Sequence, residues 1–159
     1  MNLLLSELFD IVEKQKDDTD RCNLLAQNNN DLVRTYLNLN YNPQVKWLLP
    51  EGSPPYKKEV DKPIGYEQTT LQNELKRLYI FFDERQNLKP MKRESLFISM
   101  LEGLHHSEAD LLCLVKEKNL IKKYPSITEQ IVRMVFPNLL PPKVKQSKKK
   151  PKEKKWWSF

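Results

Sequence analysis

The positions of proline constrain the fold of this chain more than any other feature. Its 159 residues include eleven prolines and three glycines. The prolines lie outside the segments with a helical apolar period, at 43–63, 90, 125, 137–142 and 151. Because proline inside a helix removes a hydrogen bond and clashes with the preceding turn, these positions mark helix ends. Few glycines argue against a β-rich fold with many tight turns and against glycine-rich phosphate loops. The chain is therefore expected to be all-α.

Apolar residues recur with helical spacing in two parts of the chain. Residues 1–40 are expected to hold three short helices of a single domain, separated by aspartate and asparagine caps. Residues 69–142 are expected to hold the helical core. The first two predicted helices there run from Thr69 or Thr70 to about Phe82 and through Leu96 to Leu104. A third begins at a cap at Ser107, and a fourth at a Ser-x-x-Glu capping box at Ser126. Together these segments predict a compact bundle of about six or seven short helices.

Residues 41–68 form a different kind of segment, which we call the strap. The stretch 40–66 contains five prolines, two glycines and four large aromatic residues, so it cannot be one helix. It is also too apolar for free disorder, and we expect it to lie extended across the helices and to bury Trp47. The alternative is an exposed docking strip in pre-ordered polyproline geometry, with Trp47 and Tyr56 as partner-binding residues.

Residues 143–159, which read KVKQSKKKPKEKKWWSF, form a basic tail. Eight lysines and one glutamate give the tail a formal charge of +7, whereas the whole chain carries +6, so the other residues sum to about −1. Trp156, Trp157 and Phe159 follow the lysines, and aromatic residues left in solvent favour aggregation unless something covers them. We expect the lysines to supply long-range attraction and the aromatics a short-range anchor for a partner.

Four interpretations of the tail remain open from the sequence. It is a solubilising extension, a nucleic-acid-binding arm, a peptide that inserts its aromatics into a protein partner, or part of a virion structural or assembly component. In the second case the lysines displace counterions from a phosphate backbone and the tryptophans stack on unpaired bases. The nucleic-acid-binding candidates are Lys145, Lys148, Lys149, Lys150, Lys152, Lys154 and Lys155.

Catalytic and metal-binding patterns are not evident in the sequence. His105-His106 has no nearby cysteine or spaced third histidine, so we expect a helix-end charge rather than a metal site. Cys22 and Cys113 are expected to be reduced, partly buried thiols. The basic residues Lys92, Arg93, Lys116, Lys118, Lys122 and Lys123 are interspersed with glutamates, which predicts a solvated mixed-charge surface. No enzyme activity, cofactor or metal is expected.

Two sequence blocks carry a family resemblance over roughly residues 1–140. The first is the aliphatic-Pro-Glu-Gly-x-Pro-Pro-Tyr run at residues 49–56. The second consists of Arg93-Glu94-x-Leu96-Phe97, Leu101-Glu102-x-Leu104, Glu108-Ala109-x-Leu111-Leu112, Val115-Lys116-x-Lys118 with Leu120, and Phe136-Pro137. Together they resemble a family of small, uncharacterised proteins of T4-like tailed phages, common in marine and cyanobacterial viruses. The resemblance implies a viral origin and no particular activity.

The tail is similar in character to the C-terminal tails with which T4-like replication and late-transcription proteins bind the sliding clamp. We therefore expect a non-enzymatic phage adaptor that binds a replication or transcription component through its aromatic terminus, while its lysines favour proximity to DNA. The partner is a phage or host protein, such as the sliding clamp or the transcription machinery. With no signal peptide and no long apolar run, we expect the host cytoplasm, or the virion, and no membrane association.

Overall fold

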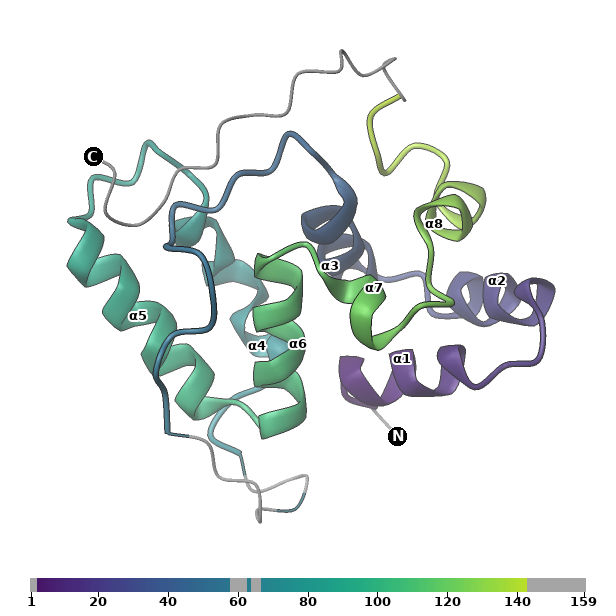
Figure 1. Cartoon of the computed structure of the whole chain (residues 1–159), viewed down its shortest axis with the longest axis horizontal. Helices are drawn as coiled ribbons and strands as arrows, with labels where there is room; N and C mark the ends of the chain where they lie inside the picture. Colours follow the sequence, from purple (N-terminus) through teal and green to yellow (C-terminus); the bar gives the residue numbers. More distant parts are fainter. Residues whose placement is uncertain (1–2, 58–62, 64–66, 143–159) are drawn as a thin grey trace.

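A computed structural model of the chain describes residues 3–57, 63 and 67–142 (Figure 1). In this part of the chain every regular element is helical, which confirms the all-α prediction. The elements are α1 (Leu5–Glu13), α2 (Asp18–Gln27), α3 (Asp31–Tyr41), α4 (Leu71–Glu74), the 3₁₀ helix η1 (Leu75–Phe81), α5 (Pro90–Gly103), α6 (His106–Lys116), α7 (Leu120–Lys123) and α8 (Glu129–Val135). The predicted tail contacts, at Trp156, Trp157, Phe159 and the seven lysines, lie outside the described residues.

Side-chain caps determine where most of these helices begin. Asp17, Asn30 and Thr70 each accept a backbone N–H from the first turn of α2, α3 and α4, with donor–acceptor distances of 2.9, 2.9 and 3.2 Å. An unpaired N–H at a helix start is satisfied in this way, which typically stabilises by about 1 kcal/mol. Pro90 is the first residue of α5, where its missing N–H has no helical partner to lose.

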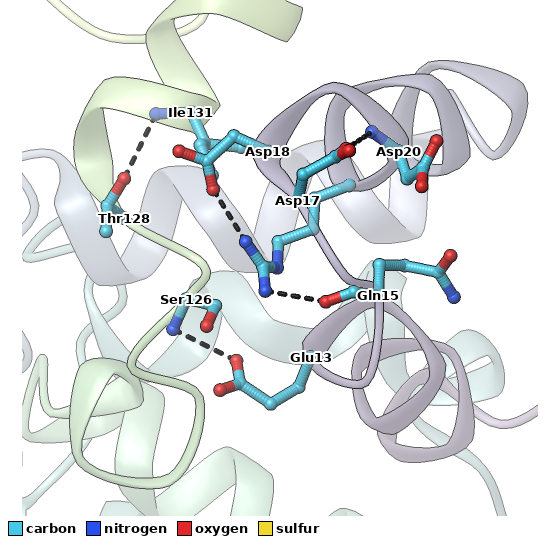
Figure 2. A network of polar contacts seen from close by, with 9 residues as sticks. Glu13, Gln15, Asp17, Asp18, Asp20, Ser126, Thr128 and Ile131 are labelled. Carbon is cyan, nitrogen blue, oxygen red and sulfur yellow. Dashed lines mark hydrogen bonds and ion pairs between the residues drawn. The ribbon is translucent and has the colours of Figure 1, made fainter.

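Two predicted caps are wrong. The cap of α6 is His105, not Ser107, because the His105 Nδ1 accepts the Ser107 N–H at 3.2 Å. The cap of α8 is Thr128, not Ser126, and it accepts the Ile131 N–H at 3.3 Å (Figure 2). The His105 side chain, which was expected to act at a helix C-terminus, instead caps the start of α6.

The single helix predicted from Thr69 or Thr70 to Phe82 divides into α4 and η1. In a 3₁₀ helix, side chains three residues apart lie on the same face. Leu78 and Phe81 follow this spacing and are buried, whereas Tyr79, which the α-helical spacing placed inside, is 44% exposed. The division of this helix and the four-residue α7 explain why the described residues hold more helical elements than the six or seven predicted.

Helix α6 lies at the centre of the fold, where it contacts α1, α3, α5 and α7 (Figure 1). Its buried apolar residues are Ala109, Leu111, Leu112, Cys113 and Val115. Helix α8 packs on α2 instead. The Ser126 N–H, in the segment before α8, donates to the carboxylate of Glu13 at the end of α1 at 3.0 Å (Figure 2). The core therefore joins the N-terminal helices to the last third of the chain.

We expect Phe97→Ala and Leu101→Ala each to lower the free energy of unfolding by about 2–5 kcal/mol, because these α5 side chains are 2% and 1% exposed. Urea unfolding followed by circular dichroism would measure the change. Ser99→Ala, on the exposed side of the same helix, serves as the control and is expected to change stability by less than about 0.5 kcal/mol. Near-zero effects at both core positions would contradict the packing of α5.

Candidate functional site

The strap begins where α3 ends and runs along α5 and α6 (Figure 1). Its Trp47 ring lies 5.7 Å from Phe82 edge-to-face, and 6.5 Å from both Phe81 and Phe97. The Leu48 N–H donates to the Phe81 carbonyl at 2.7 Å, which joins the strap backbone to η1. Trp47 is thus partly buried against the core, as expected for a packed strap, and its ring faces the protein.

Basic residues hold the strap by its backbone carbonyl groups. The Lys116 Nζ donates to the Gly52 carbonyl at 3.0 Å and pairs with the Glu117 carboxylate at 2.6 Å. The same carboxylate accepts the Gly52 N–H, and the Lys118 Nζ donates to the Asn42 carbonyl. The predicted solvated mixed-charge surface is therefore wrong for Lys116, whose side chain is 4% exposed. It binds the strap instead.

The turn that ends α6 orients the Lys118 side chain toward the strap. The Lys118 N–H donates to the Val115 carbonyl and the Asn119 N–H to the Leu114 carbonyl, a Schellman arrangement. Lys118 adopts a left-handed conformation with φ of 57°, which costs a non-glycine residue about 1 kcal/mol or more. This turn ends α6 and carries the Lys118 side chain to the strap. Gly52, with φ of 86°, supplies the matching left-handed turn in the strap.

Grooves lie along the described part of the strap on its α5 side and on its α6 side. The strap–α5 groove has a volume of about 250 Å³, and the strap–α6 groove is wider, at about 850 Å³. The first is lined by mainly apolar residues, namely Leu49, Pro50, Gly52, Ser53, Pro54, Pro55, Glu94, Phe97, Ile98 and Lys116. The second is lined by residues 52–56 and by Asp110, Cys113, Leu114, Glu117, Asn119, Lys122 and Lys123. The sequence predicted the strap but neither groove.

Tyr56, the second predicted partner-binding residue of the strap, lies at the strap–α6 groove. Its hydroxyl donates to Asp110 Oδ1 at 3.3 Å. Burial, the nearby Cys113 and the Asp110 carboxylate raise the pKa of Tyr56 well above its usual value, so the phenol stays protonated as a donor. The structure therefore separates the two strap aromatics: Trp47 faces the core, and Tyr56 borders a groove.

The titratable groups of this region are suited to structure rather than to nucleophilic chemistry. Burial raises the pKa of the Cys113 thiol to about 11, which keeps it in its unreactive protonated form at neutral pH. Within residues 3–57, 63 and 67–142, no three His, Cys, Asp or Glu side chains come together as metal ligands. The His105 and His106 ring centroids lie 4.3 Å apart with the ring planes tilted by 36°, and His105 Nδ1 lies 2.7 Å from the Ser107 hydroxyl oxygen.

Glu108 is a buried carboxyl group that the sequence analysis did not single out. It is 1% exposed and accepts the backbone N–H groups of Leu71 and Leu5, which are the first residues of α4 and α1. The pKa of Glu108 is raised to about 7, mainly by burial and to a smaller extent by the nearby Glu67 and Glu7, while the two N–H groups act in the opposite direction. Its place in the first turn of α6 does not indicate burial, because the burial depends on packing between segments far apart in sequence.

Replacing Glu108 is expected to change how stability depends on pH. The folded-state pKa of Glu108 lies above the ordinary value of 4.5. Its contribution to stability is therefore fully present below pH 4.5 and is lost as the pH rises through about 7. Relative to Glu108→Gln, which keeps an oxygen for the two N–H groups, the wild type is expected to lose about 1–3 kcal/mol between pH 5 and pH 8.

Urea unfolding of both proteins at the two pH values measures this difference. Glu102→Gln, at an exposed position of α5, is the matched control and is expected to follow the wild type at both pH values. An unchanged difference between the wild type and Glu108→Gln would contradict the raised pKa.

Removing the Lys116 ammonium group is expected to loosen the strap. Lys116→Met keeps the apolar stem but leaves the Gly52 carbonyl without its donor, so residues 48–57 should exchange their amide hydrogens about 5- to 30-fold faster, equivalent to about 1–2 kcal/mol. Hydrogen exchange with mass spectrometry measures the rates. Lys122→Met, at an exposed position of α7, is the control. Equal protection of the strap in both variants would show that the Lys116 contact does not hold it.

Among the comparisons with known proteins, a family model matches the chain. No curated protein and no solved structure matches the chain. Within the described part of the chain, no helix has the length and apolar content that crossing a bilayer requires. A family described as a family of unknown function, DUF6433, matches residues 8–122, a region that runs from α1 through the strap to α7. This match spans most of the sequence, and the chain therefore belongs to the DUF6433 family of unknown function.

Proposed function

We propose that this protein is a non-enzymatic accessory protein of T4-like phage infection that recruits a replication or transcription component through its C-terminal aromatic residues. The helical body is a rigid base for the tail, and the lysines of residues 143–159 keep the complex close to DNA. The partner presents an apolar pocket with acidic groups around it, as a sliding clamp or a transcription factor can. Such a partner would take up Trp156, Trp157 and Phe159.

One observation carries this proposal: the contacts of Trp47 and Tyr56, the two strap aromatics considered as anchors, are made within the body. Trp47 packs on three phenylalanines, and the Tyr56 hydroxyl binds Asp110. The sequence then adds three aromatics after Pro142, together with a charge of +7 that the body, at about −1, does not share. Large aromatic residues are the usual anchors of protein interfaces, and separated basic charge speeds association with acidic partners.

The phage assignment rests on the sequence motifs. Their positions coincide with residues that shape the body, since the Pro-Glu-Gly-x-Pro-Pro-Tyr run contains the Gly52 turn, and the later blocks include Phe97, Leu101, Glu108 and Lys116. These motifs thus describe a fold with a held strap, and they do not describe a catalytic site. A recruiting role is consistent with such a body, because recruitment requires a stable folded base and an accessible terminal anchor.

Nucleic-acid binding by the lysines is the second candidate, and the charge of the tail favours it. The two functions differ in their dependence on salt. Binding through counterion release weakens steeply as salt increases, whereas burial of aromatic residues in a protein pocket tolerates moderate salt. They also differ in which tail residues they need, so matched tail variants separate them.

The test is capture of partners from infected host cells with three full-length proteins, after nuclease treatment, at low and moderate salt. The proteins are the wild type, a variant with Trp156, Trp157 and Phe159 replaced by Ala, and a variant with Lys148, Lys149 and Lys150 replaced by Gln. We expect one protein partner to survive nuclease and moderate salt with the wild type, to be lost with the Ala variant, and to be reduced with the Gln variant.

The opposite pattern would contradict the proposal. If capture is lost on nuclease treatment and depends on the lysines alone, the tail binds nucleic acid. If the Ala variant keeps every partner, the body recruits them. Circular dichroism of each variant verifies that the helical body is unchanged, so a loss of capture can be assigned to the tail.

A further inference from the structure

The strap–α5 groove is a small apolar surface that the body leaves uncovered. Its walls are Leu49 and the strap prolines on one side, and Phe97 and Ile98 of α5 on the other. With a volume of about 250 Å³, it lies slightly below the ~300 Å³ at which pockets begin to accept whole drug-sized ligands. It therefore suits one or two inserted side chains better than a complete small molecule.

The charges beside the groove favour a basic occupant. Of the two charged side chains that line it, Lys116 is already paired with Glu117, and Glu94 carries a negative charge. The strap–α6 groove differs in size and charge: it is wider, and the formal charges of Asp110 and Glu117 in its lining are balanced by those of Lys122 and Lys123, so it offers a lysine-rich segment no net attraction. An apolar segment next to lysines is thus directed to the α5 side of the strap.

The tail of this chain has that chemistry and is long enough. It starts from a fixed point, because Leu140 is buried and Arg133 Nη1 donates to the Pro141 carbonyl at 2.8 Å. Trp156 lies fourteen residues beyond Pro142, and this length of chain can span about 46–50 Å when extended. A domain of this size has a radius of gyration of about 14 Å and thus a diameter near 40 Å. The reach of residues 156–159 therefore exceeds the diameter of the body.

We propose that the strap–α5 groove is the resting site of the chain's own residues 156–159, which insert aromatic side chains between the strap prolines and α5 until a partner withdraws them. This covers the aromatics that would otherwise favour aggregation. The inference rests on the proposed function, because it describes how the same aromatic anchor is regulated. The free protein is closed, and partner binding opens it.

Tethering makes such a contact effective even when it is intrinsically weak. A short linker gives the attached segment an effective concentration of the order of millimolar, so a millimolar contact is already half formed. A contact tenfold tighter would lower the apparent affinity for an outside partner about tenfold. Because the groove competes for the tail, only partners that bind the aromatic residues more tightly than the groove does withdraw them.

The test uses full-length protein labelled with 5-fluorotryptophan and observed by ¹⁹F NMR. Variants Trp156→Phe and Trp157→Phe assign the tail signals, and Trp47 reports on the body. We expect the solvent isotope shift of at least one tail signal to be roughly half or less of its value in the free peptide 143–159. In Ile98→Arg, which places a cation in the groove, the shift should rise to the free-peptide value.

Ser99→Arg, the neighbouring exposed position on α5, is the matched control and should behave as the wild type. Glu94→Lys, a charge reversal at the groove, should also release the tail and covers the case in which the Trp47 signal shows Ile98→Arg to be misfolded. Tail signals that equal the free peptide in the wild type overturn the proposal, as do signals protected to the same degree in Ile98→Arg and Glu94→Lys. Protection that disappears on dilution assigns the groove to the tail of a second copy, which also overturns it.

The two proposals fail in different ways. If the tail is released by Ile98→Arg but no partner is captured from infected cells, the closed form is established and the recruiting function is wrong. If the tail is fully exposed in the wild type and still captures a partner, the recruiting function stands and the closed form is wrong. If both are right, Ile98→Arg captures more partner than the wild type, and Ser99→Arg does not.

Discussion

The burial of α6 is the constraint on which the rest of this structure depends. Other helices pack on it from several sides, and it carries two charged residues into the interior, each with a partner from a distant segment. Glu108, near its start, accepts backbone N–H groups from the first residues of α1 and α4. Lys116, at its end, donates to the strap carbonyl of Gly52. Buried charges are costly unless paired, so these contacts fix where the distant segments lie.

The strap follows from that arrangement and in turn defines the candidate site. Lys116 and Trp47 hold the strap against α6 and the core, and grooves lie on its α5 and α6 sides. The groove on the α5 side is mainly apolar and is lined by Glu94, whereas the groove on the α6 side is wider and is lined by charges of both signs. A body with these grooves and a separate basic aromatic tail can hold or release its own anchor, which links the packing of the strap to recruitment.

Much of the fold could be predicted from local sequence, because caps and proline act within one helical turn. Asp17, Asn30 and Thr70 are examples in which a side chain of the expected type caps the expected helix. The errors at Ser107 and Ser126 arise because a neighbouring side chain, His105 or Thr128, competes for the same helix start. Capping preferences alone do not decide which of two neighbouring side chains caps the helix, because the helix start also depends on how adjacent helices pack.

The candidate site depends less on local sequence and more on tertiary structure. The sequence by itself determined the helical class, the extended strap, and the separation of a nearly neutral body from a tail of charge +7, since proline geometry and formal charge belong to each residue alone. Only the tertiary structure decided that Trp47 faces the core, that Lys116 and Glu108 are buried, and that grooves flank the strap. The physical reason is that burial and hydrogen-bond partners depend on contacts between residues that lie far apart along the chain.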